Sequence, residues 1–347
     1  MDQPVPKQDI LTKLKTRISG QNLPGDLSGK LQEEIERLEK VIGAEGYRLE
    51  FDRELKYLDF VSTLPFQNAS QDILDLKRTA QILDKNHYGL KEVKERILEY
   101  LSVLILHSRQ GQVLKAPILA FVGLVGSGKT SIASSIAESL GRKLIRIPLG
   151  GLGRVQELRG QSRYNPDAEA GRLMKLINSS GVNNPVILLD EIDRVAAESR
   201  SDIMGVLVEL LDPEQNFAFI DNYVDYPFNL SNALFIATAN NTGNIATAVM
   251  DRLEVIEMPG YSDAEKVIIG KSYILPKALQ SAGLPTSVVT IDDTLWPQIV
   301  RPLGYDGGIR SLQRNIEGMV RKIALGVVQG NPGPYRITEQ NIGQYLN

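Results

Sequence analysis

Five short apolar runs recur through the middle of the chain, and stretches with helical spacing separate them. The runs are Ile118–Val122, Leu144–Ile147, Val186–Leu189, Leu234–Ala237 and Val255–Met258. A strand that is buried on both faces of a parallel sheet reads as such an unbroken run, because helices cover both of its faces. The alternation of strand and helix therefore predicts an α/β domain built on a parallel five-stranded sheet.

Helical spacing dominates on both sides of these runs. Leu27, Leu31, Ile35, Leu38 and Ile42 mark one face of a charged N-terminal helix. Further helical patterns lie at residues 53–60, 74–83, 90–106, 264–274, 295–299 and 309–328. We expect residues 1–65 to be the helical end of an N-terminal domain or an arm, 66–259 the α/β domain, and 260–347 a small α-helical domain.

The first apolar run leads into a glycine-rich loop. Its residues are Gly123, Leu124, Val125, Gly126, Ser127, Gly128, Lys129 and Thr130, which fit G-x-x-x-x-G-K-[ST]. Such glycines let consecutive backbone N–H groups face phosphate oxygens, and the dipole of the following helix favours the same anion. Lys129 would reach the β- and γ-phosphates, and the Thr130 hydroxyl would hold Mg²⁺. A turn without a ligand is the alternative, but the strand before the loop and the helix after it favour ATP or GTP binding.

Polar residues that suit phosphate hydrolysis follow two of the other runs. Asp190 and Glu191 end the third run, at the sheet edge where ligands of open α/β sheets bind. There Asp190 can hold Mg²⁺ and Glu191 can polarise an attacking water. Asn240 follows the next run and can bind the γ-phosphate or orient that water. Arg252 and Arg310 can each bring a guanidinium to the developing charge, although an isolated Asn is more often a turn residue and an isolated Arg a surface ion pair.

Composition narrows the chemistry further. The 347 residues are 42% hydrophobic and 23% charged, which is ordinary for a soluble globular protein. The chain has no cysteine and only two histidines, so a divalent metal has to bind oxygen ligands, as Mg²⁺ does. The net charge of −3 does not indicate DNA binding, although a local basic patch stays open. No apolar run approaches the ~18 residues that cross a membrane, and the polar N-terminus is no secretory signal.

Taken together, the motifs resemble the ATPase module of Lon proteases, which are members of the AAA+ superfamily. The resemblance is carried by Leu64–Phe66, Asp84–Glu99, the phosphate loop, Leu188–Asp193, Leu211–Gln215, Phe235–Asn240, Asp251–Glu257 and Gly260-Tyr261. Asp212-Pro-Glu-Gln215 is more specific to Lon than any of the phosphate-site motifs. The resemblance implies an AAA+ P-loop NTPase with a parallel five-stranded sheet, a helical lid domain after it and a helical N-terminal extension before it.

The resemblance also implies roles for single residues. Lys129 and Thr130 are then the Walker A residues, Asp190 and Glu191 the Walker B pair, Asn240 sensor 1, Arg252 the arginine finger and Arg310 sensor 2, while His87, Tyr88 and Gly89 line the adenine pocket. It further implies a Mg²⁺-ATP-hydrolysing ring, a hexamer, that unfolds damaged or unfolded proteins and passes them to a Ser–Lys peptidase domain. We expect bacterial cytoplasm, with the mitochondrial matrix as the alternative.

The chain departs from the family pattern at three places. Leu124 and Val125 stand where two prolines are usual, which removes no group that touches phosphate. In the first pore loop Asn165 occupies the aromatic position and Tyr164 lies one residue early; in the second, Ser199 replaces a bulky residue. Both Tyr164 and Asn165 therefore remain candidates for gripping substrate. A nucleotide-dependent assembly module that pulls nothing, and a DNA-acting AAA+ ATPase, stay open as alternatives.

No stretch resembles the sequence around the family's catalytic serine or lysine. We therefore expect no peptidase activity from this chain. It is either part of a longer protein or a natural ATPase-only form.

Overall fold

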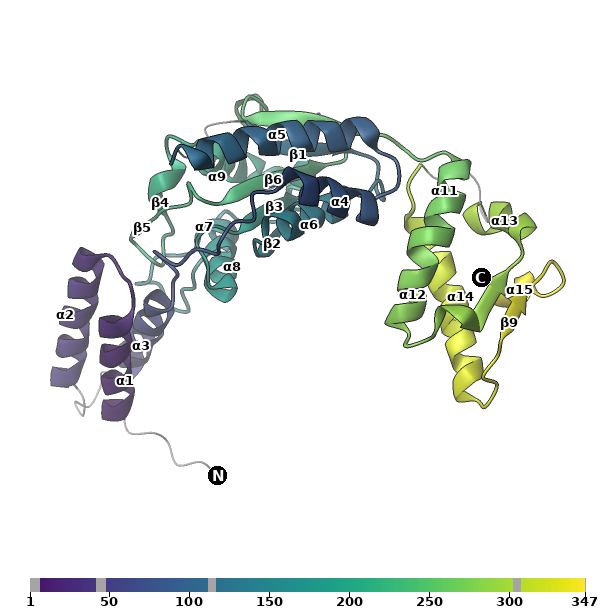
Figure 1. The fold of residues 1–347 in the computed structure, drawn as a ribbon. Coiled ribbons are helices and arrows are strands. Elements are labelled where there is room, and N and C mark those ends of the chain that lie inside the picture. Colours follow the sequence, from purple (N-terminus) through teal and green to yellow (C-terminus); the bar gives the residue numbers. More distant parts are fainter. Residues whose placement is uncertain (1–6, 42–47, 112–116, 302–306, 347) are drawn as a thin grey trace. The chain divides into compact units, whose positions relative to one another are not determined.

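The computed structural model contains a five-stranded sheet with the strand order β2-β3-β6-β1-β7 (Figure 1). Its strands are β1 (Ile118–Gly123), β2 (Leu144–Pro148), β3 (Val186–Asp190), β6 (Leu234–Ala239) and β7 (Leu253–Met258). The predicted parallel five-stranded sheet is confirmed. Because β3 pairs in parallel with both β2 and β6, the ends of these three strands share one edge of the sheet.

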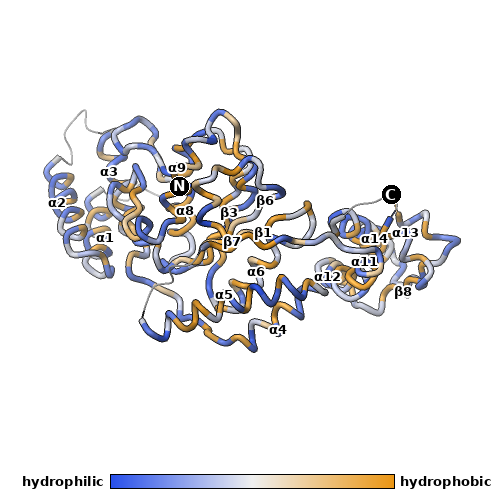
Figure 2. Tube along the Cα trace, turned by 90° about the horizontal axis from the view of Figure 1, so that it is seen from above, coloured by the Kyte–Doolittle hydropathy of each residue, from blue (hydrophilic) through white to orange (hydrophobic). Residues whose placement is uncertain are grey.

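Burial follows from each strand's place in the sheet. Every residue of β3 and β6 is buried, whereas β2, at the edge, alternates between buried and exposed positions. Strands covered on both faces gain from an unbroken apolar sequence, and an edge strand does not. The hydropathy colouring shows the apolar residues gathered along these strands (Figure 2).

The structure describes residues 7–41, 48–111, 117–301 and 307–346, so Ile42 lies outside the described residues. Within this part the chain forms two units. The first consists of the described residues within 1–74, 103–120 and 137–254, and the second of those within 75–102, 121–136 and 255–347. The first unit contains the acidic end of β3, and the second contains the phosphate loop. The domain boundaries expected at residues 65 and 259 stay a prediction.

Three N-terminal helices belong to the first unit: α1 (Lys7–Gly20), α2 (Gly25–Val41) and α3 (Arg48–Ser62). Helices α2 and α3 were predicted from their apolar spacing, whereas α1, whose Leu11, Leu14 and Ile18 are buried at helical spacing, was not. The Tyr57 hydroxyl donates to the Val224 carbonyl oxygen at 3.1 Å. These helices are therefore packed onto the α/β part of the first unit.

The remaining helices around the sheet are α4 (Leu76–Asn86), α5 (Lys91–Arg109), α6 (Lys129–Leu140), α7 (Gln156–Arg159), α8 (Arg172–Ser180), α9 (Arg200–Leu211) and α10 (Thr247–Met250). A small antiparallel pair, β4 (Phe219–Ile220) and β5 (Pro227–Phe228), was not anticipated. No helix in the described part of the chain is long and apolar enough to cross a membrane.

The C-terminal helices are α11 (Asp263–Ile269), α12 (Leu275–Ser281), α13 (Trp296–Val300), α14 (Arg310–Val328) and α15 (Ile342–Tyr345). A π-helical turn at Gly270–Ile274 joins α11 to α12, where a Cβ on Gly270 would lie 2.6 Å from the Trp296 ring. Two short parallel strands, β8 (Val289–Ile291) and β9 (Tyr335–Ile337), add a sheet that the helical pattern did not predict. The buried Trp296 belongs to the apolar core of this region.

Candidate functional site

The phosphate loop has the backbone that its motif requires. Gly126 and Gly128 adopt φ of +83° and +97°, a region that residues with a Cβ rarely enter. The Lys129 side chain folds back along the loop, where its ammonium donates to the carbonyl oxygens of Gly123 at 2.6 Å and Leu124 at 2.9 Å. Lys129 is only 8% exposed, so its positive charge is held inside the curve of the loop. A curled backbone around a fixed cation suits a phosphate group.

The start of α14 packs directly on this loop. The Ile309 N–H donates to the Gly126 carbonyl oxygen at 3.0 Å. A Cβ on Gly308 would lie 2.2 Å from the Val125 carbonyl oxygen, so the two backbones touch with no room for a side chain. Arg310 follows Ile309, is the first residue of α14 and is exposed. Within the second unit, the structure thus brings Arg310 beside the phosphate loop.

Tyr261 makes a contact with the loop that sequence reasoning missed. Its hydroxyl donates to the Ser127 carbonyl oxygen at 3.3 Å, and its backbone N–H donates to the Gly307 carbonyl oxygen at 3.0 Å. Burial raises the pKa of Tyr261 to about 12, so the hydroxyl stays protonated and able to donate. The tyrosine therefore links the loop to the segment before α14. Its only sequence signal was membership in the Gly260-Tyr261 pair.

The three residues expected at the adenine pocket lie between α4 and α5. The buried His87 ring places Nε2 2.9 Å from the Ser135 hydroxyl oxygen of α6. Burial, with the nearby Lys94 ammonium, lowers the pKa of His87 to about 4, so the ring is neutral near pH 7. The Tyr88 ring meets Tyr273 edge to face at 6.5 Å, and Gly89 adopts φ of +62°. The segment is thereby anchored next to the helix that follows the phosphate loop.

At the end of β3, Asp190 is held by two residues that the sequence did not single out. The carboxylate is 3% exposed and accepts from the Thr238 hydroxyl of β6 and from Arg146 Nε of β2, the latter at 2.6 Å. Both partners follow from the register, since β3 lies between β2 and β6. Arg146 thus neutralises the carboxylate that was expected to hold Mg²⁺.

Glu191 has an uncommon backbone conformation. Its φ of 56° and ψ of 51° lie in the left-handed region, and its N–H donates to the Thr238 hydroxyl oxygen at 3.0 Å. A Cβ on Gly150 would lie 2.8 Å from Glu191 Oε2, so the glycine leaves space for this carboxylate. Positive φ in a residue with a large side chain costs free energy and concentrates at functional sites. This left-handed conformation turns the chain at Glu191 out of the line of the strand.

These residues fit Mg²⁺ and a nucleoside triphosphate by their chemistry. Within the second unit the phosphate loop carries N–H donors, the Lys129 ammonium and the Thr130 hydroxyl, and within the first unit Asp190 carries a carboxylate, which are the group types that a phosphate and Mg²⁺ bind. No cluster of three or more acidic, histidine or cysteine side chains that could hold a metal occurs among the described residues. Mg²⁺ in nucleotide sites needs only one or two carboxylates, because phosphates and water complete its shell.

Asn240 and Arg252 both belong to the first unit. Asn240 directly follows β6 and is half-buried, one strand away from Asp190 in the sheet order. Arg252 lies between α10 and β7, where it pairs with Asp212 at 2.8 Å. Asn240 therefore belongs to the same sheet edge as Asp190, whereas Arg252 belongs to a separate ion pair.

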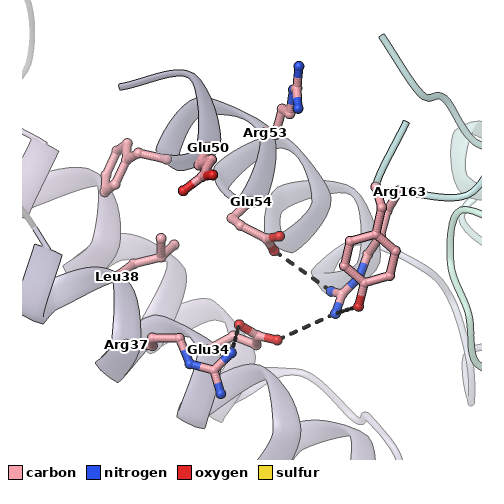
Figure 3. Close-up of a pocket in the computed structure, with 9 residues that line it drawn as sticks. Glu34, Arg37, Leu38, Glu50, Arg53, Glu54 and Arg163 are labelled. Carbon is pink, nitrogen blue, oxygen red and sulfur yellow. Dashed lines mark hydrogen bonds and ion pairs between the residues drawn. The ribbon is translucent and has the colours of Figure 1, made fainter. Parts of the chain in front are cut away.

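The segment expected to form the first pore loop contacts the N-terminal helices through Arg163. Figure 3 shows the guanidinium between Glu34 of α2 and Glu54 of α3. Its nitrogens lie 3.5 Å from a Glu34 oxygen and 3.7 Å from a Glu54 oxygen, and the three side chains line a pocket of about 440 Å³. The same guanidinium lies 4.4 Å from the centre of the Tyr57 ring. Neighbouring Tyr164 is 71% exposed and accepts a hydrogen bond from Arg163 at 3.2 Å. Tyr164 thus projects from an anchored base.

The other two residues expected in pore loops, Asn165 and Ser199, have different surroundings. Asn165 is exposed, and its N–H donates to the Ser162 carbonyl oxygen at 2.9 Å in a turn. Ser199 is buried, and its hydroxyl donates to the Leu152 carbonyl oxygen at 3.0 Å. Ser199 is therefore a packing residue in this structure.

Residues 119–261 match the model of the ATPase family associated with various cellular activities (AAA). The chain is 42% identical over 336 residues to Lon protease 2 of Herpetosiphon aurantiacus, covering 97% of the chain and 40% of that protein. It is 45% identical over 290 residues to the Lon protease of Lawsonia intracellularis, covering 84% of the chain and 34% of that protein. It is 41% identical over 326 residues to the Lon protease of Dictyoglomus thermophilum, covering 94% of the chain and 40% of that protein.

The sheet, the phosphate loop and the AAA match define a P-loop module of the AAA ATPase family. Within that class the chain belongs with the ATPase modules of Lon proteases, which it matches along nearly its whole length. The chain spans between about a third and two fifths of the length of these curated relatives.

Proposed function

We propose that the chain is a Mg²⁺-dependent ATP hydrolase that works as a homo-oligomeric ring, a hexamer, and drives protein unfolding and translocation for a Lon-type peptidase domain. The observation that carries the proposal is the phosphate loop with Lys129 folded inside it and the start of α14 packed on it. The bacterial Lon relatives support a bacterial cytoplasmic location.

In the proposed reaction the loop N–H groups and Lys129 hold the β- and γ-phosphates. Glu191 polarises the attacking water and accepts its proton, while Asn240 orients that water. As the bond from the γ-phosphorus to the ADP oxygen breaks, Arg310 stabilises the charge that develops on the phosphoryl oxygens. Arg252 does the same from the neighbouring subunit. Thr130 and Asp190 would hold Mg²⁺, which when bound would supply further neutralisation of phosphate charge.

Asp190 can bind Mg²⁺ only if the Arg146 guanidinium moves away from its carboxylate. The Arg146 side chain is 57% exposed, so it can leave the carboxylate without opening the core. We therefore assign Arg146 as the group that neutralises Asp190 when the cation is absent.

Tyr164 is the better candidate for substrate contact of the two residues in the first pore loop. A motor that pulls unfolded chains of any sequence needs a bulky side chain on a backbone segment that is held in place by other contacts. Tyr164 offers an exposed ring beside the anchored Arg163, whereas Asn165 offers a small amide in a turn. The proposed protein substrates are unfolded or damaged chains.

The proposal is tested with wild-type chain, Lys129→Ala and Glu191→Gln. We expect Lys129→Ala to lose ATP binding, and Glu191→Gln to bind ATP normally while hydrolysing it at least ~100-fold more slowly. Hydrolysis by Glu191→Gln at the wild-type rate would show that another group activates the water. Specific activity that rises steeply with protein concentration would support the shared site, and constant activity down to the monomer would contradict it.

A module that changes shape with nucleotide but pulls nothing is the second candidate. The small polar Asn165 and the neighbouring Pro166 favour it, since they grip poorly. Unfolding of a tagged reporter protein by the wild-type ring, lost in Tyr164→Ala, would support the motor. ATP hydrolysis without reporter unfolding would support the second candidate, and salt-sensitive DNA binding that stimulates hydrolysis would support a DNA-acting ATPase instead.

A further inference from the structure

Arg252 is held in place from two sides within its own chain. Its Nη2 donates to Asp212 Oδ2 at 2.8 Å, and its Nη1 donates to the Ala248 carbonyl oxygen at 2.8 Å. The side chain remains 27% exposed. A guanidinium has five N–H donors, so two contacts leave others available to a ligand outside the chain.

Asp212 is itself fixed by the turn that follows α9. One carboxylate oxygen accepts from the Glu214 N–H at 2.9 Å, and the other accepts from Gln215 Nε2 at 2.9 Å. The Arg252 guanidinium, with these donors, holds the pKa of the Asp212 carboxyl below its usual range. Pro213 presets the backbone of the turn, because its ring restricts φ. Each residue of Asp212-Pro-Glu-Gln215 therefore contributes to one rigid carboxylate.

We propose that Asp212 is the positioning residue for Arg252, and that the Asp-Pro-Glu-Gln turn serves to aim this arginine at the nucleotide of the neighbouring subunit. The proposal rests on the proposed ring ATPase. An arginine on an open loop loses most of its side-chain conformational freedom when a phosphate orders it, which weakens the contact. A carboxylate already bound to one edge of the guanidinium removes most of that loss before the phosphate arrives. Charge-assisted contacts to a carboxylate and a phosphate use different N–H groups, so both are made together.

Steady-state ATP hydrolysis by Asp212→Asn and Asp212→Glu tests the proposal. We expect Asp212→Asn to lower kcat about 10- to 100-fold with KM for ATP changed less than about threefold, because Arg252 acts on the transition state. Asp212→Glu keeps the charge and should recover a large part of kcat. Asp59→Asn is the matched control, since it breaks an exposed ion pair with Arg17 in the same unit and should leave kcat unchanged.

Mixed rings separate positioning in trans from a structural effect. We expect Lys129→Ala to lose ATP binding while it keeps an intact Asp212–Arg252 pair. Asp212→Asn keeps an intact phosphate loop and lacks the ion pair. In a random equal mixture about a quarter of the subunit interfaces combine an intact loop with an intact pair, so activity should rise to about a quarter of wild type. Activity no greater than the mean of the two single variants would overturn the proposal.

Three other results would also overturn it. Faster hydrolysis by Asp212→Asn would mean that the carboxylate sequesters Arg252 instead of aiming it. If the wild-type chain hydrolyses ATP and Asp212→Asn has the same kcat, the positioning role alone is refuted. If the wild-type chain does not hydrolyse ATP, the proposed function is refuted and this role with it.

Discussion

Replacing Gly308 by alanine would press directly on the phosphate loop. The new Cβ would lie 2.2 Å from the Val125 carbonyl oxygen and 3.1 Å from Gly126 Cα. Both neighbours are backbone atoms of the loop, so no side-chain rotation relieves the overlap. The start of α14, and Arg310 with it, must move away from the loop.

The size of that movement follows from ordinary contact distances. A Cβ and a carbonyl oxygen stay more than about 3 Å apart, so the 2.2 Å contact has to lengthen by roughly 1 Å. Overpacking of this kind costs about 1–3 kcal/mol, and a displacement of about 1 Å at a catalytic group can cost ~100-fold in rate. We expect Gly308→Ala to lower kcat for ATP hydrolysis about 10- to 100-fold.

Gly307→Ala is the matched control. Its Cβ would lie 2.5 Å from Leu124 Cδ1, which is the free end of an exposed side chain that can turn away. We expect a change in kcat of less than about threefold, since rotating an exposed side chain costs little. The same substitution one residue apart thus separates a backbone collision from a side-chain collision.

The assay is steady-state hydrolysis at saturating Mg²⁺-ATP, with ATP affinity measured by a fluorescent ATP analogue and folding checked by thermal unfolding. A folded Gly308→Ala protein should still bind ATP, because the loop N–H groups and Lys129 remain. Wild-type kcat in that variant would refute the argument that contact between α14 and the loop positions Arg310. Equal defects in both variants would refute the distinction between the two collisions.

Three further predictions concern other parts of the molecule. Arg163→Ala should reduce unfolding of a tagged reporter severalfold while the rate of ATP hydrolysis stays within about twofold of wild type. Arg53→Ala is the control, because Arg53 lines the same pocket. An equal loss of reporter unfolding in Arg53→Ala would contradict an anchoring role of Arg163. His87 has a pKa of about 4 in the folded chain and ~6.5 when unfolded, so as pH falls from 6.5 to 4 the unfolded state gains protons that the folded state does not. Wild-type stability should then fall by up to about 3 kcal/mol relative to His87→Gln in thermal or denaturant unfolding, and a constant difference between the two would refute this. Arg146→Gln should lower the Mg²⁺ concentration for half-maximal hydrolysis severalfold by leaving Asp190 uncompensated, whereas an increase would show that Arg146 assists the cation.

Several features could be predicted because they depend on neighbours in sequence. The five strands were located from apolar runs, and the phosphate loop from its glycines and the strand before it. Helix α1 was not predicted, although Leu11, Leu14 and Ile18 have helical spacing, because these apolar positions are few among the polar residues of the segment. The β8–β9 pair was missed because its strands are three residues each, too short for periodicity to register.

The partners of the candidate site residues were beyond reach of the sequence. Arg163 pairs with Glu34, 129 positions away, and Arg252 pairs with Asp212, 40 positions away. Spacing shows which side chains share a face of one helix or strand, but not which elements meet. An arginine is exposed by default, so neither residue's partners could be inferred from its type.

By itself the sequence determined a parallel sheet, the glycine-rich loop on it and the acidic pair Asp190-Glu191, since each depends on residues close together in the chain. Tertiary structure decided that Tyr261 and the start of α14 contact the phosphate loop, that Arg146 and Thr238 hold Asp190, and that Asp212 holds Arg252. The physical reason is that strand order and helix packing choose the neighbours of a side chain, and those neighbours set its charge and orientation.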